Sequence, residues 1–356
     1  MSAAARFEGL DAFRAVGIYG VVVIHFYQVM GLAWSPSIDL LIRLRDCAFP
    51  VVVLTSFFVL TRSLLRNPDR SFRQFVAGRF WRLEMPCVVW SALYWLMWGV
   101  LGPLAAGGRA SWPPASLWLS GFVHLWFLQF LFVGSVVAYP LIRAIARRPG
   151  HRWLIAASCL AAAFAYGMWG RPYLLVPIEH GWINQADPSL RVATRQATVY
   201  TQYIPAAMAI ALAADTITGL YERFRFRALS LGAVAATMAV HMSSSGPGFS
   251  RVLYSLAVFI ALLQPWPRSA VAGLLPASRY AYPIYILHPA VAQVVLVPFL
   301  VWPRLTVSLA SLVAGSVLVF VASGLLAAAL RKVCPWDWFL PLVPVGTDIR
   351  EADRAI

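Results

Sequence analysis

The sequence is poor in charge, and above all in negative charge. Only 12% of its 356 residues are charged, and 14 acidic residues stand against 29 basic ones. Soluble domains carry about twice that charged fraction, so the composition excludes an ordinary soluble enzyme. A net charge of +15 would suggest nucleic acid in a soluble protein, but here the arginines lie between long apolar runs. Membrane topology and anionic lipid head groups account for that pattern, and we expect no nucleic-acid partner.

Cysteine is also scarce, and several catalytic patterns are missing. Cys47, Cys87, Cys159 and Cys334 form no CxxC pair and no Cys/His spacing typical of zinc, so we expect neither a metal nor a disulfide framework. The sequence has no glycine-rich phosphate loop, no GxSxG elbow and no HExxH pair. No histidine is followed five residues later by aspartate, so the box typical of glycerol-phosphate acyltransferases is missing as well.

Long runs of apolar residues are abundant in the sequence. Hydrophobic residues make up 60% of the chain, and about twenty of them cross a bilayer as one helix. We predict an all-α integral membrane protein, a bundle of about ten transmembrane helices that forms one domain over residues 1–333. A short cytoplasmic or interfacial tail follows over 334–356. The approximate span limits are 12–33, 46–65, 84–101, 117–139, 152–169, 196–219, 228–242, 250–266, 280–300 and 305–330.

Arginine is distributed unevenly between the predicted connections. Alternate connections are rich in it, as over 62–82, 143–152 and 223–227, and the connections between them are poorer. Because cytoplasmic loops carry the excess of positive charge, this bias predicts that both termini are cytoplasmic. The longest outer connection, 170–196, contains aromatic and amide residues that could form one wall of a sugar site. The alternative is a solvated loop with its tryptophan at the membrane interface.

The first predicted span carries the most informative residues. Arg14 and His25 are eleven residues apart, about three helical turns or roughly 16 Å, so they share one face of the helix. Arg14 is then expected at the head-group level, where Asp11 can cap the helix and pair with it. His25 is expected near the bilayer midplane, where an imidazole needs a partner or a function and its neutral form can act as a general base. The alternative is a histidine that only packs against a neighbouring helix.

Two arginines precede the third predicted span. Arg79 and Arg82 are three residues apart, which places them on one face of a helix start at the cytoplasmic surface. Two guanidinium groups there can hold phosphates through charge-assisted, bidentate contacts. Anchoring to lipid phosphates is the alternative for such a pair.

Two further clusters place polar atoms in or near the membrane. The run from His124 to Gln129 opens the fourth predicted span, and Tyr285 and His288 lie three residues apart in the ninth, next to Pro289. Together with His25 these residues indicate a polar cavity inside the bundle. Packing between helices is again the alternative for each histidine.

In this order along the chain, the motifs resemble the acyltransferase-3 family of multi-pass membrane proteins. The resemblance covers about residues 8–295. Its second-span pattern is met only loosely, because Thr55-Ser56-Phe57 stands where the family has Ser-Gly-Phe or Ser-Gly-Tyr. The matching residues are Arg14 and His25, then Arg79, Arg82 and Pro86, then His124 to Leu128, and finally Tyr285, His288 and Pro289.

The resemblance implies an acyl-CoA-dependent O-acyltransferase. Such a protein moves an acyl group, usually acetyl, from cytoplasmic acyl-CoA to a hydroxyl of a surface or lipid-linked polysaccharide. It also implies a bacterial cytoplasmic (inner) membrane location, no permanently bound cofactor and, as partners, lipid and either a second copy or glycan-assembly proteins. Many relatives carry a fused hydrolase-like domain after the last span, and we expect the stand-alone form here.

The expected roles follow the motifs. His25 acts as general base or as a nucleophile that forms an acyl-imidazole, and we favour the base; Arg14 is the second member of the catalytic set. Arg79 and Arg82 bind the CoA phosphates, and the acceptor end is lined by His124, Trp126, Tyr285 and His288. Two alternatives stay open: an acceptor that is a secreted natural product such as a macrolide, and a secondary transporter or flippase whose histidines relay protons.

Overall fold

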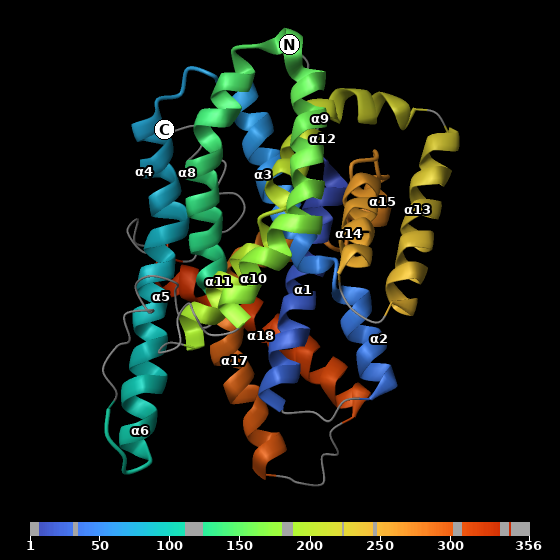
Figure 1. The fold of residues 1–356 in the computed structure, drawn as a ribbon. Helices are drawn as coiled ribbons and strands as arrows, with labels where there is room; N and C mark the ends of the chain where they lie inside the picture. The colour runs from blue at the N-terminus through green and yellow to red at the C-terminus, as the bar shows by residue number, and fades with distance from the viewer. Residues whose placement is uncertain are drawn as a thin grey trace. The chain divides into compact units, whose positions relative to one another are not determined.

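The structure is a computed structural model that describes residues 7–30, 35–110, 124–179, 188–222, 224–244, 248–301 and 308–334, together with Leu342. Within these ranges every regular element is a helix (Figure 1). The chain divides into two units, Met1–Thr55 with Ala214–Ala355 and Ser56–Ala213 with Ile356. Each unit is described by itself, and helices α3 (Ala48–Arg66) and α12 (Tyr203–Leu220) contribute to both.

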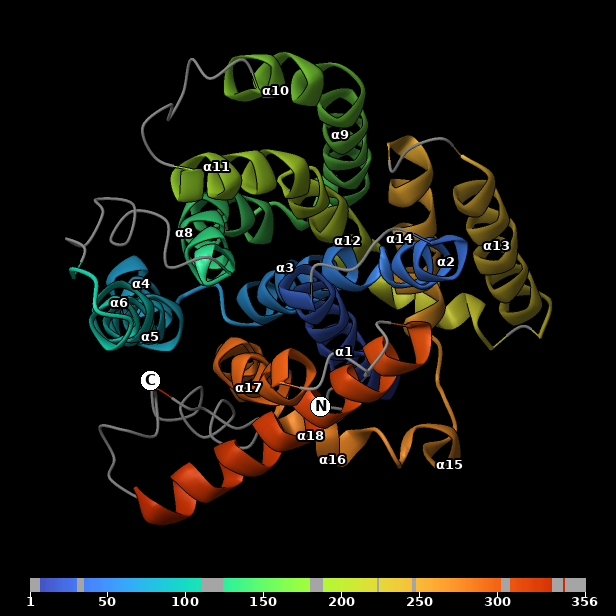
Figure 2. The same cartoon turned by 90° about the horizontal axis from the view of Figure 1, so that it is seen from below.

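The first unit is built around α1. That helix packs against α17, α18 and α14, while α13 packs against α14 and α2, and Figure 2 shows α17 and α18 beside α1. Besides its parts of α3 and α12, the unit consists of α1 (Glu8–Met30), α2 (Pro36–Arg45), α13 (Phe224–Ser243), α14 (Phe249–Leu262), α15 (Arg268–Val271), α16 (Leu275–Arg279), α17 (Ala281–Val301) and α18 (Leu309–Val333).

The second unit is built around α8, which packs against α4, η1, α5 and α11. Three of its segments, η1, η2 and η4, are π-helical, a form that is often found as a bulge at functional sites. Besides its parts of α3 and α12, the unit consists of α4 (Phe72–Arg79), η1 (Phe80–Glu84), α5 (Met85–Trp95), η2 (Leu96–Leu101), α6 (Gly102–Ala105), α8 (Trp126–Ala146), η3 (Pro149–His151), α9 (Arg152–Ala165), η4 (Tyr166–Gly170), α10 (Arg171–Glu179) and α11 (Pro188–Tyr200).

Within the described residues, seven helical segments are long and apolar enough to cross a membrane. The chain is therefore an all-α, multi-pass membrane protein, as the composition predicts. Two shorter apolar helices, Phe249–Leu262 and Ala281–Leu296, fall within predicted spans eight and nine. The seven segments are Glu8–Gln28, Pro36–Arg66, Phe72–Ala105, Trp126–Ala146, Arg152–Val176, Leu190–Leu220 and Leu309–Val333.

Two predicted connections are wrong. The residues from Phe72 onward, predicted as the loop before the third span, form a continuous helix as far as Ala105. The helix begins there because the Ser71 side chain caps it by accepting a hydrogen bond from Gln74 N, at 3.3 Å. The predicted outer loop over 170–196 is helical at both ends, in α10 and α11, and its residues 180–187 lie outside the described residues.

Hydroxyl groups inside the apolar helices are satisfied within their own helix. The hydroxyls of Thr55, Thr61, Ser316 and Ser323 each donate to the carbonyl oxygen four residues earlier at 2.7 Å. Because hydrocarbon offers no water to a polar group, these bonds make the side chains compatible with a membrane.

Glycine permits two close helix contacts in the first unit. A Cβ atom on Gly20 would lie 3.0 Å from the Cβ of Ala48, so α1 and α3 approach closely there. A Cβ on Gly315 of α18 would collide with the ring of Phe26, which is fully buried. Such small-residue contacts are how membrane helices pack without a hydrophobic driving force. They hold α1, and His25 with it, in a fixed position.

Candidate functional site

His25 and His288 lie together in the first unit. Their ring centroids are 5.2 Å apart, with the ring planes inclined by 41°. His25 lies in the C-terminal half of α1, and His288 lies in the second turn of α17. The two helices pack directly against each other. Tyr285 completes the group, with its ring centroid 6.1 Å from that of His288. His288 and Tyr285 are buried, and His25 is only partly covered.

The backbone of α17 fixes the orientation of His288. Its Nδ1 lies 2.7 Å from the carbonyl oxygen of Tyr285 and 3.2 Å from that of Ile284. Carbonyl oxygens only accept, so Nδ1 carries the proton and donates it. In the neutral ring Nε2 is then the basic nitrogen. The histidine pair therefore has one member whose tautomer is set by the helix that carries it.

Arg14 lies on the same helix as His25, as predicted, and pairs with Asp11. The Arg14 Nη1 is 3.5 Å from Asp11 Oδ1, and 41% of the arginine side chain is exposed. The predicted capping role of Asp11 is wrong, because α1 begins at Glu8 and Asp11 already lies inside its first turn. The carboxylate still stabilises the helix N-terminus through the dipole.

Arg79 and Arg82 belong to the second unit, and their setting differs from the prediction. They lie inside the continuous helix Phe72–Ala105, at the junction of α4 with the π-helical η1, rather than at a helix start. The Arg79 guanidinium lies over the ring of Phe75, with its Cζ 5.6 Å from the centroid. Both arginines are partly exposed. A π-helical turn displaces the side chains that follow it, so the face they share cannot be read from their spacing.

His124 and Trp126 also belong to the second unit, where His124 immediately precedes α8. The His124 ring is buried edge-on against Tyr94, with centroids 5.5 Å apart. The Trp126 indole stacks on Tyr200, with centroids 6.1 Å apart and planes inclined by 18°. These contacts pack α8 against α5 and α11. Aromatic packing therefore accounts for much of the burial of both residues.

Two polar contacts that sequence reasoning missed hold α8 against the helix carrying the arginine pair. Gln129 Nε2 donates to Glu84 Oε1 at 3.0 Å, and the Cys87 thiol donates to the Leu125 carbonyl at 3.5 Å. The sequence places Gln129 inside a predicted span, but the hydrogen-bond partner of its side chain lies 45 residues away in sequence. Only the folded chain reveals that Glu84 is that partner.

The predicted site residues thus fall into two groups. Arg14, His25, Tyr285 and His288 belong to the first unit, and Arg79, Arg82, His124 and Trp126 belong to the second. In the predicted outer connection 170–196, the aromatic residue Tyr173 lies on α10 and is 78% exposed, and residues 180–187, which include further aromatic and amide side chains, lie outside the described residues. Within the described part of the chain, no group of three His, Cys, Asp or Glu side chains is arranged to hold a metal ion.

Comparison with known proteins places this arrangement in a family. No curated protein and no solved structure matches the chain. The acyltransferase-3 model, described as an acyltransferase domain, matches residues 7–328, a range that includes all eight predicted site residues. The chain, a multi-pass membrane acyltransferase, therefore belongs to the acyltransferase-3 family.

Proposed function

We propose that this membrane acyltransferase takes an acyl group, most simply acetyl, from acyl-CoA and transfers it to a hydroxyl of a surface or lipid-linked polysaccharide. The observation that carries the proposal is the pairing of His25 with His288 at 5.2 Å on two packed apolar helices. Hydrocarbon disfavours an imidazole without a function, and here two are held together with a fixed tautomer on one of them. Helix packing alone accounts less well for the His25–His288 pair, because two helices can pack at this point without any histidine.

The chemistry assigned to His25 is general-base catalysis. The acceptor hydroxyl gives its proton to His25 as its oxygen attacks the acyl carbonyl, and the thiolate of CoA leaves and takes a proton in turn. His288, with its Nδ1 proton committed to the carbonyls of Tyr285 and Ile284, orients the His25 ring. Such a base contributes about a hundred- to ten-thousand-fold to a rate.

The donor is assigned on the chemistry of guanidinium groups. Arg79 and Arg82 are partly exposed arginines, and they are assigned to the phosphates of CoA. Arg14, with 41% of its side chain exposed, is a third cation for the donor. Each assignment is tested separately, because binding groups act on KM and the base acts on kcat.

The proposed location of the reaction rests on charge and on the family. The arginine bias of alternate connections supports cytoplasmic termini, and the family's chemistry supports a bacterial inner membrane with acyl-CoA taken from the cytoplasm. The acceptor then lies at or beyond the outer face. Among acceptors, a polysaccharide is preferred on the family's chemistry, and a secreted natural product is the alternative within the same reaction class.

The test is release of free thiol from acetyl-CoA by purified protein in lipid nanodiscs, with and without an extract of the host's envelope glycans. We expect release by the wild type that rises with extract and falls at least about a hundredfold in His25→Ala. Tyr19→Phe, on the same helix, is the matched control and should release thiol at the wild-type rate. Folded protein that releases no thiol from any short-chain acyl-CoA would overturn the proposal and favour a transporter. Retention of more than about a tenth of the activity in His25→Ala would remove His25 from the chemistry.

A further inference from the structure

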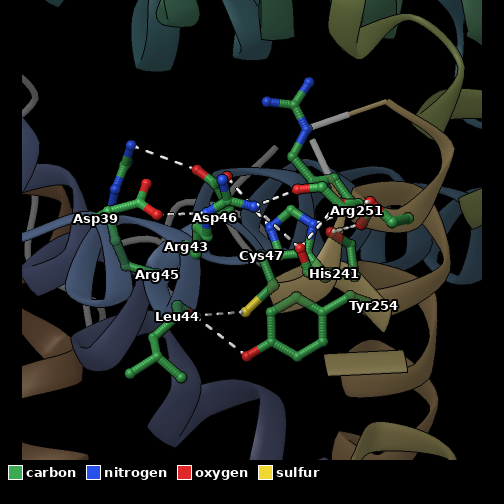
Figure 3. Close-up of polar contacts among 12 residues, drawn as sticks. Asp39, Arg43, Leu44, Arg45, Asp46, Cys47, His241, Arg251 and Tyr254 are labelled. Atoms are coloured by element: carbon green, nitrogen blue, oxygen red, sulfur yellow. Dashed lines mark hydrogen bonds and ion pairs between the residues drawn. The ribbon is translucent and has the colours of Figure 1, made fainter. Parts of the chain in front are cut away.

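A second cluster of reactive side chains lies in the first unit, on segments other than the helices that carry His25 and His288. It joins three segments: the break between α2 and α3, the last turn of α13 and the first turn of α14 (Figure 3). At its centre His241 lies between Asp46 and Ser250. The His241 Nε2 is 3.3 Å from Asp46 Oδ2, and its Nδ1 is 3.1 Å from Ser250 Oγ.

The charge of Asp46 bears on which nitrogen of His241 is basic. The carboxylate lies within ion-pair distance of Nε2, without the alignment of a hydrogen bond, and its negative charge favours the ring proton on that nitrogen. Nδ1 is then the acceptor. The Ser250 hydroxyl lies 3.1 Å from it and 3.0 Å from the Ser244 hydroxyl, so it can donate to Nδ1 while it accepts from Ser244. An acid, an imidazole and a hydroxyl connected in this sequence are the elements that activate a serine as a nucleophile.

The ring of His241 is buried and packed against Tyr254. It is 1% exposed and stacks on Tyr254, with centroids 5.7 Å apart and planes inclined by 21°. The Tyr254 hydroxyl in turn donates to the Leu44 carbonyl at 3.1 Å. An imidazole fixed in this way is pre-organised for one proton transfer, which is what a catalytic base requires.

The backbone around the base is fixed by Arg43. Its Nη1 donates to the carbonyl oxygens of Ser244, at 2.6 Å, and His241, at 3.3 Å, and its Nε donates to Asp39 at 2.8 Å. Arg43 thereby ties α2 to the end of α13. The arginine is committed to these partners, so the cluster is built to position a base rather than to bind an anion.

Ser250 stands where a reacting carbonyl could be stabilised. It is the second residue of α14, and the residue at the N-cap, Gly248, has no side chain to cap the helix. The first amide groups of a helix lack partners within it and attract negative charge. They can therefore stabilise the oxyanion that forms when a neighbouring hydroxyl attacks a carbonyl. Ser250 keeps 9% of its surface exposed, and the side chain of Arg43 keeps 25%, so the cluster borders the surface of the protein.

The direction of α14 shows at which level of α1 the cluster lies. Glu8, at the start of α1, accepts a hydrogen bond from Arg268 at 2.9 Å, and a Cβ on Gly9 would meet Leu262 at the end of α14. Since α1 and α14 pack directly and the start of one lies at the end of the other, they are antiparallel. Because α14 has 14 residues, about 21 Å, its first turn lies level with the middle of α1, near Gly20. A Cβ on Gly20 would lie 3.5 Å from the Cβ of Arg45, the residue before Asp46.

We propose that Ser250 is a second acyl-transfer nucleophile, which holds the acyl group as a serine ester before an acceptor hydroxyl takes it. Its Oγ attacks the acyl carbonyl, forming a C–O bond as the bond to the leaving thiolate breaks. The hydroxyl proton passes to His241 Nδ1 and from there to the leaving group. In the second half the acceptor hydroxyl gives its proton to His241 and forms the new ester, and Ser250 recovers its proton. The physiological donor rests on the proposed function, but the site itself does not.

The test uses p-nitrophenyl acetate, which acetylates activated serines without CoA. The full chain in nanodiscs should release a burst of about one p-nitrophenol per chain, and mass spectrometry of its peptides should find one acetyl group on Ser250. Ser250→Ala should remove the burst. His241→Asn should slow acetylation at least about a hundredfold. Asp46 is a positioning residue, so Asp46→Asn should slow acetylation at saturating ester and leave the ester concentration at half-maximal rate unchanged.

Two variants separate chemistry from folding. Ser255→Ala removes a buried hydroxyl on the same helix, which donates only to the Arg251 carbonyl at 2.6 Å, and it should keep the full burst. Ser250→Cys keeps the size of the side chain and should trap the acetyl group as a thioester on residue 250. Folding of each variant is checked by its melting temperature.

The outcomes distinguish this inference from the proposed function. Wild-type protein without an acetyl group on residue 250 would overturn the inference, as would glycan acylation at the full rate by Ser250→Ala. Acetylation of Ser250 by the ester, in a protein that releases no thiol from acetyl-CoA, would support the inference while the proposed function fails.

Discussion

His288 lies with its ring centroid 5.2 Å from that of His25, and its Nδ1 proton is committed to the backbone of α17. The backbone of α17 thus determines which nitrogen of His288 is basic, and His25 lies on a different helix, α1. A change in α17 should therefore alter the chemistry assigned to α1. This dependence gives the first of four predictions.

His288→Ala should lower kcat by about ten- to a hundredfold, because His25 loses the ring that orients it. The KM for acetyl-CoA should change by less than about threefold, since His288 is assigned no contact with the donor. The measurement is thiol release at saturating acetyl-CoA. Gln293→Ala, at an exposed position of the same helix, is the control and should keep the wild-type kcat. A variant whose KM rises while kcat is unchanged would show that His288 acts in donor binding instead.

Arg79→Ala and Arg82→Ala should each raise the KM for acetyl-CoA by about ten- to a hundredfold. A charge-assisted hydrogen bond contributes about 1.5–3 kcal/mol, which converts to that range. Arg73→Ala is the matched control, because Arg73 lies on the same helix and is exposed. Equal effects in all three variants would mean that general positive charge, rather than this pair, attracts the donor.

Arg14→Ala should also raise the KM for acetyl-CoA and leave kcat within about threefold of the wild-type value. The reason is its position: it pairs with Asp11 and is 41% exposed, so it is available to a phosphate. Asp11→Asn removes the pairing and should lower the KM slightly. A fall in kcat for Arg14→Ala, with an unchanged KM, would show that Arg14 acts in the catalytic step instead of donor binding.

Gly315→Ala should destabilise the protein by about 1–3 kcal/mol, the usual cost of overpacking. The added methyl group would meet the buried ring of Phe26 on α1. Gly324→Ala on the same helix is the control, because its Cβ would lie 3.6 Å from Ile284, an ordinary contact. Melting temperatures in nanodiscs make the comparison. A stable Gly315→Ala would show that α1 and α18 can separate without cost.

The sequence carries the local part of the site. Arg14 and His25 share α1, and Tyr285 and His288 share α17, because a helical repeat of 3.6 residues relates positions within one element. The sequence does not predict the contact between His25 and His288. That contact depends on how α1 and α17, which are far apart in sequence, pack against each other, and residue spacing within one helix gives no information about it.

Two features of the fold also escape spacing arguments. The start of the third span at Phe72 depends on the Ser71 cap, which is easily overlooked beside the arginines that follow. The π-helical turn over Phe80–Glu84 then changes the geometry of the arginine pair. The contact between Asp46 and His241 is of the same kind, because a single aspartate directly after an arginine, here Arg45, predicts a local ion pair first.

Because the chain is synthesised from its N-terminus, Arg43 is made well before the residues that it contacts. Arg43 donates to the carbonyl of His241, 198 residues later in the sequence. At about 5–20 residues per second, ribosomal synthesis needs roughly 10–40 s to cover that distance. During that delay the guanidinium enters the translocon with Asp39, one turn away at 2.8 Å, as its local counter-ion. The first unit can close only when the last third of the protein has emerged, whereas the residues of the second unit are already complete. Early truncation of the messenger should therefore leave the N-terminal helices without their partners and expose them to membrane proteases.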